Sequence, residues 1–123
     1  MRIDPRPILV VDDDEYSRLM MVTLLDLKGY SVVTAANGAE ALRVARQQLP
    51  SLILLDLIMP VMDGVEFRRH QREEPRLRDI PVVCLSARHD ARERANELGF
   101  AAFLSKPFDL ETVIAAVREI CPA

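Results

Sequence analysis

Five short apolar segments recur along the chain, and the longer stretches between them carry apolar residues at the spacing of one helix face. The short segments are apolar at nearly every position instead of alternating, which is typical of strands covered on both faces of a sheet. Regular alternation of strand and helix predicts a parallel sheet with helices on both faces and right-handed crossovers. The predicted strands cover residues 8–11, 31–35, 52–55, 80–85 and 100–104.

The intervening stretches predict five helices. The first of them ends at Gly29, a residue type that suits a helix C-terminus. We expect the apolar stripe of this helix to face the sheet. The stripe consists of Tyr16, Leu19, Met20, Leu24 and Leu27.

The later helices are predicted from caps and spacing. Asn37 and Glu40 resemble a capping box at the start of the second helix, and Asp109 is the expected N-cap of the last. The third and fourth helices should span about residues 64–73 and 88–98, the fourth stopping before a glycine. Inward-facing positions are expected at Leu42, Ala45, Val113, Ile114, Val117 and Ile120.

The chain has 123 residues without a linker, repeat or low-complexity stretch, which predicts a single domain over residues 1–123 and no output domain in this chain. Half of the residues are hydrophobic and 28% are charged, as in ordinary globular proteins. No apolar run approaches the ~20 residues of a membrane span. The N-terminus lacks the apolar core of a signal peptide, so we expect no membrane association and a cytoplasmic location.

Charge and cysteine content narrow the functional classes. The formal net charge of −3 argues against direct binding of nucleic acid, which needs a positive surface. Two cysteines provide neither a disulfide framework nor metal-site spacing. We expect Cys84 to be a buried thiol and Cys121 to be incidental. His70 and His89, and the charged run at 68–79, are interpreted as solvated.

Polar residues follow four of the five predicted strands. All C-terminal strand ends of a parallel sheet lie on one edge, so these residues should converge there. Only the second strand ends in plain alanines, which fits the strand order 2-1-3-4-5, with a ligand site between strands 1 and 3. The converging residues are Asp12 and Asp13, Asp56, Ser86 and Lys106.

This set of residues suits metal-assisted phosphoryl transfer. Adjacent carboxylates about 4 Å apart repel by roughly 4 kcal/mol at an effective dielectric near 20. A hard cation, most plausibly Mg²⁺, offsets that repulsion and invites a phosphoryl group, which a carboxylate can accept as an aspartyl phosphate. Ser86 would then donate a hydrogen bond and Lys106 would neutralise an oxygen. Taken singly, Asp14 could simply be a helix N-cap, Ser86 a turn residue and Lys106 a surface charge.

With these residues in place, the chain resembles a response-regulator receiver domain of two-component signalling over essentially its whole length, a flavodoxin-like fold. The resemblance rests on four motifs in order. They are Asp12-Asp13, the D-x-x-M-P-x-M-D-G run from Asp56 to Gly64, Ser86-Ala87, and Lys106-Pro107.

The resemblance implies that Asp56 receives a phosphoryl group from the phosphohistidine of a sensor histidine kinase or a histidine phosphotransfer protein. It implies that Asp13 and Asp56 ligate Mg²⁺ directly, with Asp12 acting mainly through water and the backbone carbonyl of Ile58 as a further ligand. Catalysis would be limited to self-phosphorylation and slow autodephosphorylation, so the protein would not be an enzyme in the usual sense.

The resemblance also implies a switch. Ser86 and Phe103 would form the switch pair. Separately, a cis peptide between Lys106 and Pro107 would aim the lysine inward. The pair would alter the face of the fourth helix, fifth strand and fifth helix for an unidentified downstream protein. Two positions depart from the commonest pattern: Phe103 stands where tyrosine is frequent, and an apolar Ile58 flanks the path of the hydrolytic water. We hypothesise that Ile58 prolongs the life of the phosphoryl group.

Two other interpretations remain open. The Asp12-x-Asp14 spacing superficially matches aspartate-nucleophile phosphohydrolases, although Tyr16-Ser17 follows in place of their threonine or valine pair and the chain is short for that fold. A degenerate receiver acting as a fixed scaffold is the third interpretation, and the complete acidic set argues against it.

Overall fold

The computed structural model describes residues 6–56, 64–86, 99–105 and 109–121. They contain one parallel sheet of five strands in the order β2-β1-β3-β4-β5, so the predicted fold class and strand order are confirmed. The strands are β1 (Ile8–Val11), β2 (Val32–Ala35), β3 (Leu52–Asp56), β4 (Val82–Ser86) and β5 (Ala102–Ser105).

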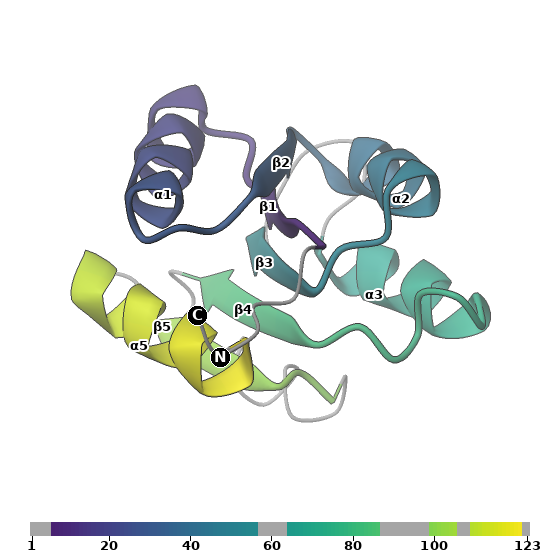
Figure 1. The fold of residues 1–123 in the computed structure, drawn as a ribbon. Helices are drawn as coiled ribbons and strands as arrows, with labels where there is room; N and C mark the ends of the chain where they lie inside the picture. Colours follow the sequence, from purple (N-terminus) through teal and green to yellow (C-terminus); the bar gives the residue numbers. More distant parts are fainter. Residues whose placement is uncertain (1–5, 57–63, 87–98, 106–108, 122–123) are drawn as a thin grey trace.

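Helices cover both faces of this sheet (Figure 1). On one face lie α1 and α5, and on the other α2 and α3. The fourth predicted helix, at 88–98, falls outside the described residues. Among the helices that the structure describes, none has the length and apolar character needed to cross a membrane. The helices are α1 (Glu15–Leu27), α2 (Gly38–Gln47), α3 (Gly64–Glu73) and α5 (Leu110–Ile120).

The central strands β1 and β3 are buried along their whole length, which explains their continuous apolar sequence. They pair in register, with Ile8 opposite Leu52 and Val11 opposite Leu55. Ile8 belongs to the core under α1 and α5, whereas its neighbour Leu9 belongs to the core under α2 and α3. Each strand therefore contributes side chains to two separate cores.

The predicted inner stripe of α1 is wrong. Tyr16 is 71% exposed and Leu27 is 77% exposed, whereas Met21 and Leu25 are the buried residues of the helix. Leu24 alone of the predicted stripe packs against the core, and it is only partly buried. The helix is therefore turned so that an apolar face meets solvent.

The predicted caps are present. The side chain of Asn37 accepts a hydrogen bond from the amide of Glu40 at 2.9 Å, and the Glu40 carboxylate reaches back to the Ala36 amide at 3.2 Å. Asp109 caps α5 by accepting from the amide of Thr112 at 2.8 Å. Gly29 follows α1 with φ of +92°, the left-handed conformation that glycine adopts most readily.

The inner faces of α2 and α5 are as predicted. Leu42 and Ala45 of α2 are buried. On α5 the stripe packs onto the sheet, with only its last member partly exposed. The buried members are Val113, Ile114 and Val117, and the partly buried one is Ile120.

Two polar expectations need correction. Within the charged run at 68–79, Arg68 and Gln71 are buried at 8% and 0% exposure, so that run is not wholly solvated. Cys121 is buried rather than incidental, and its carbonyl accepts a hydrogen bond from the Tyr30 hydroxyl at 2.7 Å. That bond ties the end of α5 to the chain just before β2.

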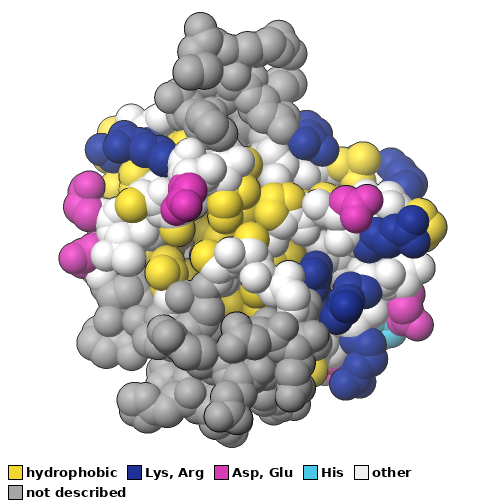
Figure 2. Space-filling model, turned by 90° about the horizontal axis from the view of Figure 1, so that it is seen from below, with side chains coloured by type: hydrophobic (Ala, Val, Ile, Leu, Met, Phe, Trp, Pro, Cys, Tyr) yellow, Lys and Arg dark blue, Asp and Glu magenta, His cyan; other side chains and the backbone are white. Residues whose placement is uncertain are grey.

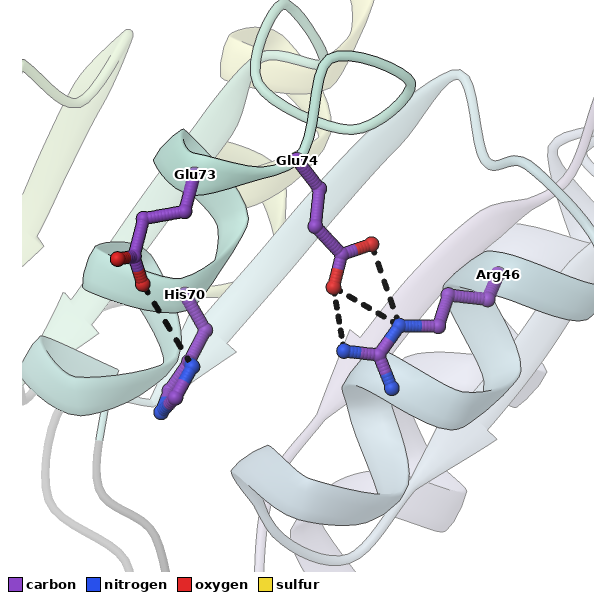
Figure 3. Close-up of polar contacts among 4 residues, drawn as sticks. All are labelled: Arg46, His70, Glu73 and Glu74. Atoms are coloured by element: carbon purple, nitrogen blue, oxygen red, sulfur yellow. Dashed lines mark hydrogen bonds and ion pairs between the residues drawn. The ribbon is translucent and has the colours of Figure 1, made fainter.

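A surface ion pair joins α2 to Glu74, the residue that follows α3 (Figure 3). Arg46 of α2 donates from Nε to both carboxylate oxygens of Glu74, at 2.9 and 3.2 Å, and from Nη2 to one of them. The arginine lowers the pKa of the Glu74 carboxyl, mainly through the hydrogen bond. The pair is solvent-accessible, so it contributes little to stability.

Candidate metal centre

The end of β1 places two aspartates next to a third at the end of β3. Val11, the last residue of β1, lies between Ala35 and Leu55 on the neighbouring strands. The Asp12 amide continues the pairing by donating to the Ala35 carbonyl at 3.1 Å. Asp56 is the last residue of β3, so its side chain emerges at the same edge of the sheet.

The carboxylates of Asp12, Asp13 and Asp56 come together there. One oxygen from each lies within 4.8 Å of the others. Asp12 and Asp56 are each only 7% exposed, whereas Asp13 is exposed. At this separation two charges repel by roughly 3 kcal/mol at an effective dielectric near 20, and less where water reaches them. The three carboxylates therefore repel one another, and a cation bound among them would offset that repulsion.

Backbone and side-chain contacts hold Asp12 in place. Its Oδ1 accepts a hydrogen bond from the Asp14 amide at 2.9 Å. Its backbone carbonyl accepts from Nη1 of Arg18 at 2.7 Å. Arg18 lies in α1, one turn beyond the acidic run. The sequence offered no signal for its contact with Asp12, because the two residues are six positions apart. Arg18 thus fixes the backbone of the site and leaves the carboxylate facing the other acids.

Asp14 has a different role from its neighbours. Its Oδ2 accepts hydrogen bonds from the Ser17 amide at 2.8 Å and from the Ser17 hydroxyl at 2.6 Å. Asp14 is therefore the N-cap of α1. The simple interpretation of this residue is confirmed.

The pKa of the Cys84 thiol is affected by the neighbouring Asp56 carboxylate. Cys84 lies in β4 opposite Leu55 and is fully buried. Burial, and to a lesser degree the charge of Asp56, raises the pKa of its thiol to about 12. The thiol is therefore protonated at neutral pH, which makes it a poor nucleophile.

The donor set fits a hard divalent cation. Among the described residues, this is the one group of three or more acidic, histidine or cysteine side chains that could hold a metal ion. All of its donors are carboxylate oxygens, which Mg²⁺ prefers, with no nitrogen or sulfur ligand. Two of the three are buried and one is exposed, so water reaches the cluster through Asp13.

The other predicted site residues are only partly placed. Ser86 is the last residue of β4 and Phe103 is the second residue of β5, but the side chains of both lie outside the described part of the structure. Ile58 and Lys106 also fall outside the described residues. His70 lies on α3, half-exposed, with Nδ1 at 3.8 Å from the Glu73 carboxylate (Figure 3). It takes no part in the acidic cluster, and His89 is outside the described residues.

Comparison with known proteins agrees with this geometry. Residues 8–118 match the model of the response regulator receiver domain family. The chain is 38% identical to the probable transcriptional regulator ycf27 of Cyanophora paradoxa, over 98% of this chain and 50% of that protein. It is 31% identical to the polar-differentiation response regulator DivK of Brucella anthropi, over 93% of this chain and 94% of that protein.

Solved structures show the same fold. The chemotaxis protein CheY4 of Vibrio cholerae superposes with a TM-score of 0.86 at 32% identity, covering 94% of this chain and 98% of that one. The chain spans about half the length of the first curated relatives that it matches.

Proposed function

The chain belongs to the response-regulator receiver domain family, and we propose that Asp56 accepts a phosphoryl group in a Mg²⁺-dependent reaction. The donor is the phosphohistidine of a sensor histidine kinase or of a histidine phosphotransfer protein. One observation carries the proposal: three carboxylate oxygens from Asp12, Asp13 and Asp56 lie within 4.8 Å of one another at the carboxyl edge of a parallel sheet. A receiver domain is a signalling module rather than a conventional enzyme.

In this reaction an Asp56 carboxylate oxygen attacks phosphorus. The phosphorus–nitrogen bond of the phosphohistidine breaks, and the imidazole leaves with the electron pair. Asp13 and Asp56 would hold the cation directly. Asp12 acts through water, which agrees with the engagement of its Oδ1 by the Asp14 amide. When bound, Mg²⁺ supplies charge neutralisation and coordination positions for phosphoryl oxygens.

We assign the remaining roles by family resemblance. Ser86 donates a hydrogen bond to one phosphoryl oxygen, and Lys106 neutralises another. The Ile58 carbonyl completes the metal ligands. The apolar side chain of Ile58 leaves the hydrolytic water unoriented, so Ile58→Asn should speed dephosphorylation. Equal dephosphorylation rates in the two proteins would remove this role.

The output of the domain is a changed binding surface. We propose that Ser86 and Phe103 switch the face that includes β5 and α5, and that this face binds a downstream protein. Figure 2 looks onto the side of the molecule where β5 and α5 lie, and it shows apolar side chains gathered near the centre with charged ones mostly around them. In this proposal residues 1–123 act as a single receiver domain.

The phosphohydrolase interpretation has less support. It would need Asp14 as a second catalytic carboxylate, and both described contacts of Asp14 Oδ2 are capping bonds to Ser17. Replacing Asp56 separates the two functions, because a hydrolase that uses Asp12 would keep its activity on phosphomonoesters in Asp56→Ala.

Mass spectrometry of the intact protein after incubation with acetyl phosphate tests the proposal. With Mg²⁺ we expect a mass increase of about 80 Da that maps to Asp56. The increase should disappear with EDTA and in Asp56→Asn, whereas the control variant Asp79→Asn, altered at an exposed aspartate far from the cluster in sequence, should be labelled normally. Labelling that persists in Asp56→Asn would contradict the proposal.

A further inference from the structure

Arg68 is a charged residue in an unusual place, the buried face of α3. It is only 8% exposed, and Gln71, one turn later on the same helix, is completely buried. Burial, followed by the nearby charge of Arg72, lowers the pKa of the Arg68 guanidinium. A buried cation costs free energy unless it is well hydrogen-bonded, so its contacts are informative.

The guanidinium joins α3 to the chain just before β5. Nη1 donates to Oε1 of Gln71 at 2.7 Å, and Nη2 donates to the Gly99 carbonyl at 3.2 Å. The guanidinium carbon also lies 5.7 Å from the centre of the Phe100 ring, within the range of a cation–π contact. Phe100 in turn packs with Val65, near the start of α3, against buried Cys84.

Gln71 extends the same network to the chain before β4. Its Nε2 donates to the Leu77 carbonyl at 2.8 Å and to the Ile80 carbonyl at 3.1 Å. One amide side chain therefore accepts from Arg68 and donates to two backbone groups. Both segments that lead into β4 and β5 are bound to α3 through two adjacent side chains.

In these contacts the Arg68 guanidinium meets an amide oxygen, a backbone carbonyl and an aromatic ring. A neutral backbone carbonyl orients the guanidinium more than it neutralises the guanidinium charge. Buried polar contacts of this kind can select one arrangement of the chain at some cost in stability.

We propose that Arg68 and Gln71 form a latch that fixes the segments before β4 and β5 to α3, so that α3 and the start of β5 move as one unit. The latch lies at the edge of the sheet opposite the acidic cluster. Its signalling consequence rests on the proposed function: a displacement of α3, which begins eight residues after Asp56, would be passed to β5, the strand that contains Phe103.

The Ala101 amide is the natural reporter of this latch. It donates to the Val82 carbonyl at 2.9 Å, the first pairing contact of β5 beyond Phe100. The Ile8 amide, which donates to the Ser31 carbonyl at 2.8 Å on the far side of the sheet, serves as the reference. Exchange of both amides with deuterium is measured in ligand-free protein. The result is therefore independent of whether Asp56 can be phosphorylated.

The test compares Arg68→Met with Arg69→Met, because Arg69 is the exposed neighbour with the same charge. We expect Arg68→Met to speed exchange at Ala101 about tenfold relative to Ile8, a local opening, and Arg69→Met to leave both unchanged. Equal rates at Ala101 in the two variants would overturn the latch. So would equal acceleration at Ala101 and Ile8, because that would reflect a general loss of stability.

Arg68→Lys serves as a second variant in case the methionine variant folds poorly. Lysine keeps the charge and the apolar stem but lacks the planar fork that reaches Gln71 and Gly99 together. The latch predicts an Ala101 rate between those of the wild type and Arg68→Met. A wild-type rate in Arg68→Lys would show that the charge alone, without the forked contact, suffices, and would overturn the latch.

Discussion

At the carboxyl edge of the sheet three carboxylates lie within 4.8 Å of one another, whereas at the opposite edge the buried side chains of Arg68 and Gln71 lie beside hydrogen-bond partners. Both edges contain buried polar groups. They differ in the kind of contact: the carboxyl edge brings like charges together, and the opposite edge pairs hydrogen-bond donors with acceptors.

The two edges therefore have different roles: one fixes the arrangement of the chain, and the other is the candidate functional site. At the opposite edge, where the amino ends of the strands lie (the amino edge), hydrogen-bonded polar groups set the geometry of the chain before β4 and β5. At the carboxyl edge, repulsion among the three carboxylates should lower the stability of the metal-free protein, and a cation bound there, as proposed, would relieve it. Removing a carboxylate charge at the carboxyl edge should therefore stabilise the metal-free protein, whereas removing a hydrogen-bonded side chain at the opposite edge should destabilise it.

The largest effect is expected from Gln71→Ala at the amino edge. The substitution leaves the Leu77 and Ile80 carbonyls without these donors and opens a cavity. We expect the free energy of unfolding to fall by about 3 kcal/mol in urea denaturation. Gln47→Ala, at an exposed position of α2, is the matched control and should change it by less than about 0.5 kcal/mol. Similar losses in the two variants would remove the amino-edge half of the contrast.

At the carboxyl edge, Asp12→Asn should have the opposite sign. Asparagine keeps an oxygen for the Asp14 amide and replaces a negative charge with a donor toward the other acids. In Mg²⁺-free buffer we expect an increase of about 1.5 kcal/mol in the free energy of unfolding. The exposed control Asp79→Asn should be nearly neutral. A destabilised Asp12→Asn protein under these conditions would show that the acids do not repel.

The raised pKa of Cys84 predicts a pH dependence at the same edge. A thiol whose folded pKa is about 12, above its unfolded value of 9.0, stabilises the protein fully below pH 9 and loses that contribution as the pH rises toward 12. Relative to Cys84→Ala, the wild type should lose about 1 kcal/mol between pH 8 and pH 10. Parallel stability curves for the two proteins over this range would argue against a raised pKa of the buried thiol.

The smallest effect is expected for the exposed ion pair between Arg46 and Glu74. Arg46→Ala should let the pKa of Glu74 rise toward its ordinary value, which NMR titration can follow. Because that pKa is depressed in the folded protein, the small stabilisation exists above the ordinary carboxyl pKa and disappears as the pH falls through the depressed value. Salt should weaken it further. An unchanged Glu74 titration would mean that the pair in Figure 3 does not persist in solution.

The hydrophobic pattern predicted α5 correctly and α1 incorrectly, for a physical reason. On α5 polar residues leave a single apolar stripe, and Val113, Ile114 and Val117 are buried as expected. On α1 apolar residues occupy more than one side of the helix, so the spacing alone could not select Met21 and Leu25 as the buried pair.

The convergence of the acids could be predicted because the ends of parallel strands share one edge, which needs only the strand order. The contacts of Arg18 and Arg68 could not. Arginine is usually exposed, and nothing in the local sequence indicates a distant backbone carbonyl such as that of Gly99. Long side chains that reach across elements need the assembled fold before their partners can be identified.

A thermal melt at increasing Mg²⁺ concentration tests the central claim most directly, with ionic strength held constant by potassium chloride. If the acidic edge is a metal site, stability should rise by about 1.4 kcal/mol for each tenfold increase in Mg²⁺ above the dissociation constant. Asp13→Asn, which removes one carboxylate of the cluster, should shift this rise to higher Mg²⁺. A midpoint that is independent of Mg²⁺ in the wild type would contradict the assignment of Asp12, Asp13 and Asp56 as a cation site.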